Sequence, residues 1–223
     1  MANDELRERI EAVEERIGRA CARAGRARGE VMLLAVTKVF PAQAILEGYE
    51  LGLREFGENY VQEFEGKAAQ VAGLEGARFH LIGHLQSNKS AKAGELFGVI
   101  QTVDSVKLAR RLEGMGRRIE VYIEVKLSEE DSKHGVMPEE LAELAAAIRG
   151  MGNLELKGLM TMPPWSDDAE SARPYFRRLR ELAGEFGLEG LSMGMSHDLE
   201  TAIEEGSTVV RVGTALFGSR KKT

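Results

Sequence analysis

Eight short β-type segments, separated by helical ones, most constrain the fold of this chain. The eight are VMLLAV from Val31, REFGE from Arg54, FHLIG from Phe79, VIQTV from Val99, VYIEV from Val121, LKGLM from Leu156, LSMG from Leu191 and VVRVG from Val209. Two parallel strands need a long crossover between them, usually a helix, whereas antiparallel strands need only a tight turn. The regular alternation therefore predicts an α/β fold with a parallel sheet.

Helical stretches of suitable length lie between these segments. Amphipathic examples are 61–71, 105–115, 138–148 and 167–186, and a charged helical stretch covers most of residues 1–30. Eight strands with seven crossovers fit a (β/α)8 TIM barrel with an extra N-terminal helix, and a doubly wound open sheet is the alternative. No linker or repeat divides the chain. We expect a single domain over 1–223, with the barrel itself at about 31–218.

The composition argues against several classes of protein. The chain has 30 Lys and Arg against 36 Asp and Glu, and its net charge of -6 disfavours general binding to nucleic acid. Its apolar runs are too short to span a bilayer, and residues 1–30 lack the apolar core of a secretory signal. We therefore expect a cytoplasmic protein that binds neither nucleic acid nor membrane. Cys21 is the one cysteine, and we expect it to be structural.

Polar residues concentrate where the predicted strands end. In a TIM barrel the carboxyl ends of all the strands meet at one rim, which carries the active site. These positions hold Thr37-Lys38, Glu58-Asn59, His80, His84, Asp104, Lys126, Thr161, Ser196, Arg211 and Gly213-Thr214. We therefore expect a functional site at this rim.

Lys38 ends an otherwise aliphatic strand, LLAVTK. At the mouth of an apolar barrel, burial disfavours the ammonium form and leaves the neutral amine available as a nucleophile. Such a lysine can form a Schiff base with a carbonyl compound. The alternative is a lysine that extends from the strand end into solvent.

A second stretch, residues 191–218, has the features of an anion site. Ser196 precedes a helical run, and Gly213-Thr214 follow the last strand where another helix could begin. Amide groups at a helix N-terminus, a hydroxyl and a glycine together suit a phosphate, although Ser196 could be a plain helix cap and Gly213 a tight turn. The loops after strands seven and eight are also a frequent phosphate site in barrels. With Lys38, they predict either pyridoxal 5′-phosphate (PLP) or a phosphorylated carbonyl substrate.

The same residues belong to an ordered set of motifs that resembles one family. In chain order the motifs are AVTKVFPAQAI, FGENYVQE, FHLIGHLQSNK, TVDS, SEEDSKHGV, GLMTM and SMGMSHDLETAIEEGSTVVRVGTALFG. They run from about Val31 to Gly218 and resemble the pyridoxal phosphate homeostasis family, also called the YggS/PROSC family of PLP-binding proteins. Each fragment alone is weakly specific, whereas the ordered set is highly specific.

The resemblance implies a barrel of the alanine racemase N-terminal type that holds PLP. The implied cofactor-binding residues are Lys38, Asn59, His80, Ser196, Arg211, Gly213 and Thr214. By resemblance, Lys38 carries the cofactor as a Schiff base, while Ser196, Gly213 and Thr214 hold its phosphate. Arg211 is expected either to face the pyridine nitrogen or to support the phosphate, and the other two residues are expected as direct neighbours.

Two positions depart from the pattern of the family. Phe79 stands where Trp is common, and Lys126 stands where Asn is usual. The first change keeps an aromatic ring, whereas the second replaces an amide with a cation at the end of the fifth strand. The segment that follows, 128–136, is expected to be either an ordered wall of the site or a lid.

We expect a carrier of PLP in vitamin B6 homeostasis rather than an enzyme, with PLP-dependent enzymes as recipients. Racemases of the related fold take their second acid/base from a tyrosine in a separate β-domain, and only SRKKT follows Gly218 here. One alternative is a weak PLP-dependent amino-acid racemase. Another is a class I aldolase, in which Lys38 would need a carboxylate partner such as Glu58, Asp104 or Glu124.

We expect no metal site and no obligate assembly. His80 and His84 could share a strand face, but strand spacing places them too far apart to chelate one ion easily. We expect a monomer, although the sequence is also compatible with a dimer.

Overall fold

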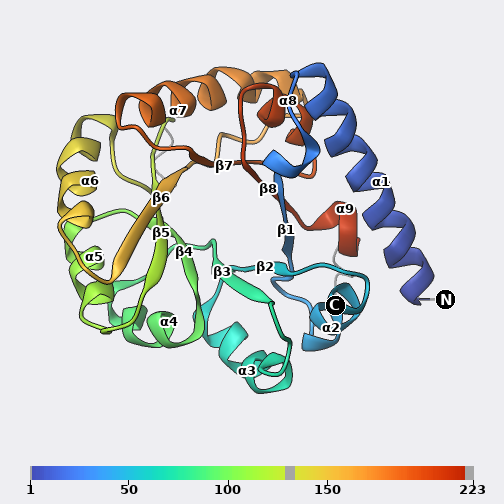
Figure 1. The fold of residues 1–223 in the computed structure, drawn as a ribbon, viewed down its shortest axis with the longest axis horizontal. Helices are drawn as coiled ribbons and strands as arrows, with labels where there is room; N and C mark the ends of the chain where they lie inside the picture. Colours follow the sequence, from blue (N-terminus) through green and yellow to red (C-terminus); the bar gives the residue numbers. More distant parts are fainter. Residues whose placement is uncertain (1, 129–133, 219–223) are drawn as a thin grey trace.

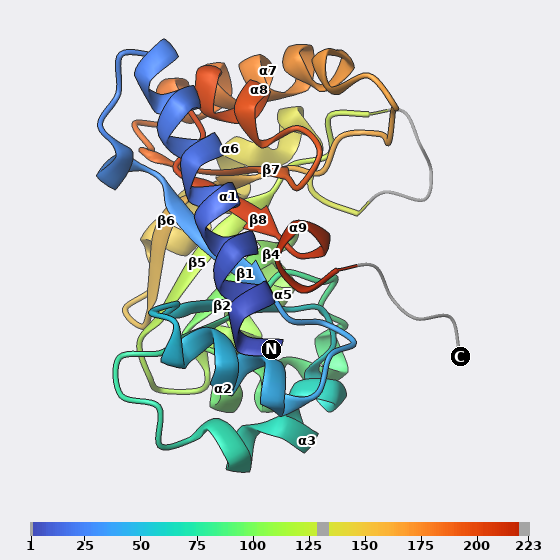
Figure 2. The same ribbon diagram turned by 90° about the vertical axis from the view of Figure 1, so that its right-hand side faces the viewer.

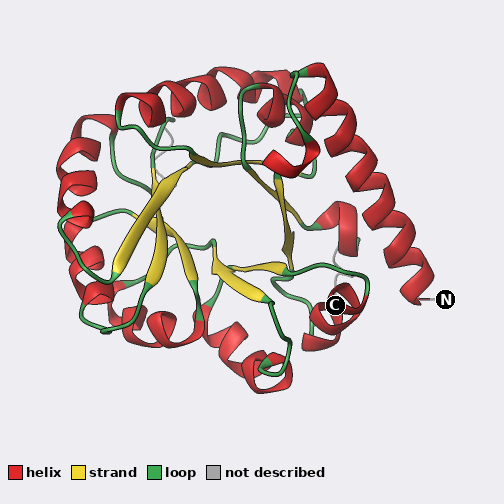
Figure 3. Cartoon of the chain, in the orientation of Figure 1, coloured by secondary structure: helices red, strands yellow, loops and turns green. Residues whose placement is uncertain are grey.

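The strands close into a barrel in the computed structural model, which describes residues 2–128 and 134–218. The strands are β1 (Met32–Val36), β2 (Glu55–Glu58), β3 (Arg78–Leu81), β4 (Val99–Val103), β5 (Ile119–Glu124), β6 (Leu154–Met160), β7 (Gly190–Met195) and β8 (Val209–Val212). All neighbouring pairs are parallel, and β1 pairs with β8 with Leu34 opposite Arg211. Figure 3 shows the ring of strands inside its layer of helices. The predicted TIM barrel is confirmed, and the open-sheet alternative is wrong.

The helices surround this ring (Figure 1). They are α1 (Ala2–Arg23), α2 (Ala42–Glu50), α3 (Val61–Val71), α4 (Ser90–Leu96), α5 (Val106–Glu113), α6 (Leu141–Arg149), α7 (Arg173–Glu185), α8 (Leu199–Glu204) and α9 (Thr214–Phe217). Four short 3-10 turns accompany them: η1 (Arg28–Glu30), η2 (Ser87–Lys89), η3 (Pro138–Glu140) and η4 (Ala169–Ala172). Each strand is thus followed by at least one helical element, as the crossover pattern predicted.

The predicted boundaries differ from the observed ones where local chemistry ends an element early or late. The predicted helix at 167–186 is split, since a 3-10 turn, η4, precedes α7. Asp168 caps η4 by accepting a hydrogen bond from the amide of Glu170 at 3.0 Å. Pro174 then lies in the first turn of α7, where a missing N–H costs least. The strand β6 begins at Leu154, two residues before its predicted start.

Two apolar layers hold the barrel together. The interior is filled by side chains from alternate strand positions, namely Leu34, Val36, Ile82, Val99, Tyr122, Met160 and Val209. The larger layer lies between the strands and the helices and includes Phe56, Phe64, Phe97 and Phe176, all buried. A parallel barrel needs apolar residues on both faces of each strand, and this explains the nearly continuous aliphatic runs in the sequence.

The extra N-terminal helix, α1, lies outside the ring against α8 and α9, and Figure 2 shows it running along that side of the barrel. Its buried face includes Val13, Ile17 and Ala20, with the thiol of Cys21 buried beside them. The amphipathic pattern of residues 1–30 is thereby explained by docking onto the two helices that follow β7 and β8. No helix in the described part of the chain is long and apolar enough to cross a membrane.

Candidate functional site

The strand ends enclose a cavity of about 320 Å³ at the carboxyl rim of the barrel. Six of the seven predicted site residues line it: Lys38, Asn59, Ser196, Arg211, Gly213 and Thr214. They come from the ends of β1, β2, β7 and β8, which the closure of the barrel places side by side. The structure therefore brings the lysine and the expected anion site together in one cavity.

Lys38 lies in a tight turn directly after β1, and its side chain is half-buried. The next residue, Val39, has a φ of 64°, which is unusual for a β-branched residue and costs free energy. The Val39 amide donates a hydrogen bond to the Glu63 carboxylate at 2.6 Å, and the Phe40 amide donates to the Thr37 carbonyl at 3.2 Å. These bonds fix the turn that presents Lys38.

A second lysine, Lys67, is buried next to this turn. Its Nζ lies 2.9 and 3.1 Å from the two carboxylate oxygens of Glu58, 2.6 Å from Glu63 and 3.1 Å from the carbonyl of Thr37. The hydroxyl of Thr37 also donates to Glu58 at 2.8 Å. Burial raises the pKa of Glu58, although Lys67 opposes this effect. We call Thr37, Glu58, Glu63 and Lys67 the buried network.

The buried network could have been suspected from the sequence. Lys67 lies on the apolar stripe of α3, with Phe64 and Val71 about one turn away on either side. A lysine on the buried face of an amphipathic helix needs a partner charge, because an isolated buried ammonium is costly. The partner Glu58 is supplied by the end of β2, and sequence spacing alone does not identify it.

The opposite wall of the cavity is formed by the loops after β7 and β8. The amide of Ala215 donates to Oγ of Ser196 at 3.3 Å and so joins the two loops. A Cβ on Gly213 would lie 3.4 Å from the Cβ and carbonyl oxygen of Val36, so the last strand approaches β1 closely here. The first turn of a helix also presents amides without intrahelical partners, and Thr214 begins α9.

The helix α1 supports this wall from outside the barrel. Arg16 donates to the carbonyl of Ser196 at 3.0 Å and to both carboxylate oxygens of Glu200 at 2.7 and 2.8 Å. These contacts are 180 residues or more apart in the chain, so only the folded structure reveals that the extra helix reaches the candidate site.

Arg211 is buried in the barrel interior at the floor of the cavity. Its guanidinium donates to the carbonyl and hydroxyl of Ser192 at 2.7 and 2.8 Å and to the carbonyl of Thr161 at 2.9 Å. Burial lowers the pKa of Arg211 to about 10, and the negative charges of Asp198 and Glu124 oppose the shift. The group therefore stays cationic at neutral pH.

His80 is the predicted site residue that does not line this cavity. The alternation of β3 points it into the barrel interior, where its Nε2 lies 2.6 Å from Glu55 and its Nδ1 lies 2.9 Å from Gln101. Gln101 in turn accepts a hydrogen bond from the Ser192 hydroxyl at 2.6 Å, and Ser192 contacts Arg211. His80 is thus connected to the cavity through side chains, whereas its direct contact with a cofactor stays a prediction.

Several residues that line the cavity were missed by sequence reasoning. They are Val36, Ile82, Met162, Trp165, Met195 and His197. Trp165 is 70% exposed, and its ring lies 5.1 Å from that of His197. The single tryptophan in the loop after the sixth strand, MTMPPW, was the available signal. The apolar members carry no such signal because they resemble ordinary core residues.

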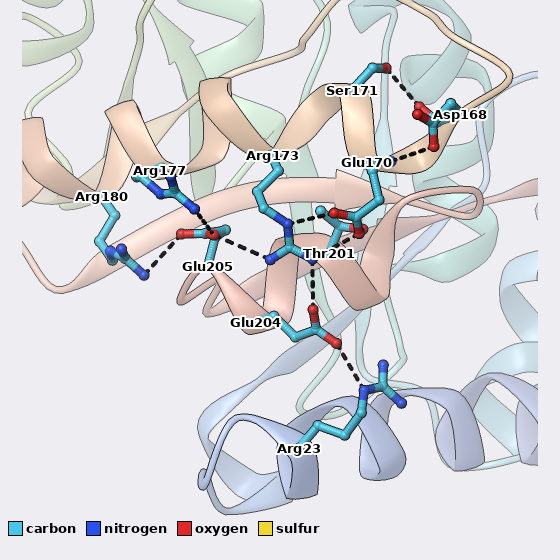
Figure 4. Close-up of polar contacts among 10 residues, drawn as sticks. All are labelled: Arg23, Asp168, Glu170, Ser171, Arg173, Arg177, Arg180, Thr201, Glu204 and Glu205. Atoms are coloured by element: carbon cyan, nitrogen blue, oxygen red, sulfur yellow. Dashed lines mark hydrogen bonds and ion pairs between the residues drawn. The ribbon is translucent and has the colours of Figure 1, made fainter.

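A network of charged side chains at the surface surrounds α8 (Figure 4). Arg173 of α7 donates to Glu170, Glu204 and Glu205, with donor–acceptor distances between 2.7 and 3.2 Å. Arg23 of α1 donates to Glu204 from the other side at 2.8 Å. We call the set of Arg23, Glu170, Arg173, Arg177, Arg180, Glu204 and Glu205 the surface network. It ties α1 and α7 to α8, the helix that follows the Ser196 loop.

The remaining predicted rim residues lie elsewhere. Lys126 does not line the cavity, and its amide donates to the carbonyl of Val136 at 2.9 Å. Of segment 128–136, residues 129–133 lie outside the described residues, so the choice between wall and lid stays open. Within the described ranges, no group of three or more His, Cys, Asp and Glu is placed to hold a metal ion.

The cavity contains cations but no acidic group among the described residues that line it. Of the carboxylates considered for an aldolase, Glu58 accepts a hydrogen bond from Lys67 within the buried network, and Glu124 is buried in β5. None of the four tyrosines lines the cavity either. Tyr122, for example, fills the barrel interior, where burial raises its pKa to about 12.

Comparison with known proteins first defines the class. The sequence profile of the alanine racemase N-terminal domain family matches residues 9–221. A solved alanine racemase from Clostridium difficile 630 superposes with a TM-score of 0.73 at 15% identity, over 98% of this chain and 58% of the racemase. The chain therefore has the barrel of this class, and the racemase has further sequence that the match does not cover.

Closer relatives define the particular family. The chain is 45% identical to the pyridoxal phosphate homeostasis protein of Pseudomonas aeruginosa, over 96% of each sequence. It also superposes on PipY from Synechococcus elongatus PCC7942 with PLP bound, with a TM-score of 0.85 and 36% identity, over 96% of this chain and all of that one. The chain belongs to the pyridoxal phosphate homeostasis protein family, which confirms the resemblance inferred from its motifs.

Proposed function

We propose that this protein binds PLP covalently through the ε-amino group of Lys38 and serves PLP homeostasis without evident catalytic turnover. One observation carries the proposal: the Lys38 amine and the polar groups of Ser196 and Thr214 line the same cavity of about 320 Å³, and no acidic side chain lines it in the described parts of the chain. This volume lies within the usual range for small-molecule sites, about 300–1,000 Å³.

The residues present fit the chemical groups of PLP. Ser196, Gly213 and Thr214 offer hydroxyl and amide donors to a phosphate, as the loops after β7 and β8 do in many barrels. Apolar walls formed by Ile82 and Met162 suit a pyridine ring. When bound, PLP supplies an aldehyde that reacts reversibly with amines and a ring that can withdraw electrons.

The protein's own groups favour holding this cofactor over using it. Arg211 is a buried cation fixed by three hydrogen bonds, and a cation that faces the ring nitrogen would keep that nitrogen unprotonated and weaken its electron-withdrawing capacity. No tyrosine or carboxylate in the described ranges lines the cavity to move a proton on a second face. We therefore propose a carrier, with PLP-dependent enzymes as recipients, over the racemase and the aldolase.

The test is an absorbance spectrum of the purified protein, followed by borohydride reduction and peptide mass spectrometry. We expect a yellow protein with reduced pyridoxyl on Lys38. Lys38→Ala should lose the covalent cofactor and keep the fold, because the side chain lies at the rim. Lys89→Ala, in the turn η2 after β3, is the matched control and should stay yellow. A colourless protein that takes up no added PLP would overturn the proposal.

Turnover is tested separately. We expect no interconversion of alanine enantiomers at high protein concentration. Measurable racemisation that disappears in Lys38→Ala would instead establish the weak racemase.

A further inference from the structure

A second cavity, of about 460 Å³, adjoins the one that holds Lys38. The two share Asn59, Ile82 and Met162 in their walls. In the wall of the second cavity the backbones of Gly83 and Asn59 approach each other closely, since a Cβ on Gly83 would lie 2.2 Å from the carbonyl oxygen of Asn59. The second cavity opens at the same rim, between the start of α3, the loop after β3 and His134.

The charge of this second cavity contrasts with that of the whole chain. The protein carries 36 acidic residues against 30 basic ones, yet no Asp or Glu lines either cavity in the ranges that the structure describes. The second cavity instead has Lys89, His84 and His134 in its walls. A concave surface lined by one sign of charge concentrates ligands of the opposite sign. The second cavity therefore suits a ligand with an anionic group.

The cationic and imidazole groups are held in place. Nζ of Lys89 donates to Oε1 of Gln62 at 2.8 Å. The rings of His84 and His134 stack with centroids 3.8 Å apart and planes 13° apart, and Nδ1 of His84 lies 3.6 Å from Asp104. Burial and the neighbouring His134 lower the pKa of His84, with Asp104 opposing. The fixed cation of the cavity is thus Lys89, and the stacked imidazoles add hydrogen-bonding groups.

The same walls also suit an ammonium group. Asn59 and Gln86 carry side-chain amides, whose carbonyl oxygens accept hydrogen bonds from N–H donors, while Oε1 of Gln62 already accepts from Lys89. A cation combined with these amides offers partners to both ends of a zwitterion, whereas the NH2 groups of the same amides also suit a bare phosphate, so the test below includes inorganic phosphate as a competitor. Asn59 lines both cavities, so an ammonium group held there would lie next to the cavity that Lys38 lines.

We propose that the second cavity binds a free α-amino acid, with its carboxylate at Lys89 and the two histidines and its amino group toward Asn59. This inference rests on the proposed function and deepens it, because an amino compound is the class of molecule with which a lysine-bound aldehyde exchanges. The protein would then bring PLP and an amino acid together at adjoining positions of one rim.

The test uses full-length Lys38→Ala, in which no covalent exchange can occur, with L-alanine, L-glutamate and L-lysine as probes in NMR titrations. We expect saturable shifts from at least one amino acid. A second change, Lys89→Gln, should weaken that binding by about 10-fold or more, since a hydrogen bond to a charged group contributes about 1.5–3 kcal/mol. Lys92→Gln is the matched control, because Lys92 lies on α4, contacts Glu65 and Glu95 and does not line the cavity.

Three outcomes would overturn the inference. The first is the absence of saturable binding by any of the probes. The second is equal weakening by Lys89→Gln and Lys92→Gln, which would indicate a general effect of charge. The third is equally tight binding of inorganic phosphate that competes with the amino acid, which would indicate an unselective anion site. PLP uptake by the unmodified protein is measured independently, so loss of this inference is distinguishable from loss of the proposed function.

Discussion

Next to the Lys38 turn, one lysine is buried against a glutamate, whereas around α8 several arginines and glutamates meet at the surface (Figure 4). Both arrangements hold a loop of the same site. The buried network fixes the turn that presents Lys38, and the surface network fixes the helix that follows Ser196. The side chains of Glu58 and Lys67, the central pair of the buried network, are 0% and 8% exposed, whereas all charged side chains of the surface network except that of Glu205 are at least 26% exposed.

This difference shows that a loop of the site can be held either by a buried ion pair or by a solvated network of ion pairs, and the two differ in how much stability each partner contributes. A buried pair depends on each partner, because removal of one leaves an uncompensated charge in a poorly solvated place. A surface network has several partners for each charge and water as a substitute, so each member contributes little and salt screens it. Mutations, salt and pH should therefore separate the two networks.

The largest effect is expected from Lys67→Ala, which leaves Glu58 buried without its cation. We expect a loss of about 3 kcal/mol in the free energy of unfolding, the usual cost of breaking a buried pair. Urea denaturation followed by circular dichroism measures it. The double variant Glu58→Gln with Lys67→Met removes both charges and should recover most of the loss. A loss below about 1 kcal/mol for the single variant would show that water reaches Glu58.

A smaller effect is expected from Arg16→Gln, which removes the contacts of α1 with the Ser196 carbonyl and with Glu200. The Ser196 loop would lose its outer support, and the affinity for PLP should fall by about 3- to 10-fold, the equivalent of one modest hydrogen bond. Covalent attachment to Lys38 should persist. Spectroscopic titration of the protein with PLP measures the change.

The control for Arg16→Gln is Arg19→Gln on the same helix, since Arg19 contacts only Glu15 among the interactions described for it. It should leave the affinity for PLP unchanged. Equal affinities for the two variants would mean that α1 does not support the wall formed by the loops after β7 and β8.

A still smaller effect is expected from Arg173→Gln in the surface network. We expect a loss of about 1 kcal/mol or less, because Glu204 and Glu205 keep other arginine partners. At about 1 M salt, where charges are screened beyond about 3 Å, this loss should nearly vanish. The loss in Lys67→Ala should survive the same salt, since buried pairs are screened much less. Equal salt sensitivity in both variants would contradict the comparison.

Acid should act on the two networks in opposite directions. Burial raises the pKa of Glu58 above 4.5 against the effect of Lys67, so the contribution of Glu58 to stability increases as the pH falls through that raised pKa. The hydrogen bond from Arg173, opposed by burial and aided by Arg23, lowers the pKa of Glu204 below 4.5. The contribution of Glu204 is therefore present above pH 4.5 and is lost as the pH falls through the lowered pKa.

Urea denaturation at several pH values measures these slopes. Glu58→Gln should remove a contribution that makes the folded state more stable at low pH. Glu204→Gln should remove a contribution that makes the folded state more stable at high pH. The two variants should therefore deviate from the parent with opposite sign. Deviations of the same sign would mean that one of the two carboxyl groups has been assigned the wrong environment.

The fold and most residues of the candidate site could be predicted from the sequence. Alternation of aliphatic strands with amphipathic helices predicted the barrel, because a parallel sheet requires both. The rule that strand ends share one rim then placed Lys38, Ser196 and Gly213 together, and the structure has them in one cavity. The motif set predicted the family, which the close relatives confirm.

The sequence alone did not identify which side chains contact those residues. His80 was expected beside the cofactor, and the structure has it within the barrel interior between Glu55 and Gln101, connected to the cavity only through other side chains. The apolar wall residues Met162 and Met195 gave no signal, since core and cavity linings share a composition. Lys67 gave a weak signal, and its partner Glu58 could be found only from the structure.

By itself, then, the sequence determined which elements form and which chemical groups stand at their ends, because strand period and turn residues act over a few positions. Only the tertiary structure decided which of these groups meet. Closure of the barrel pairs β8 with β1, so that Leu34 lies opposite Arg211 and the wall after β8 faces Lys38. Such contacts join residues far apart in the chain, and they form only when the whole sheet closes and buries its two apolar layers.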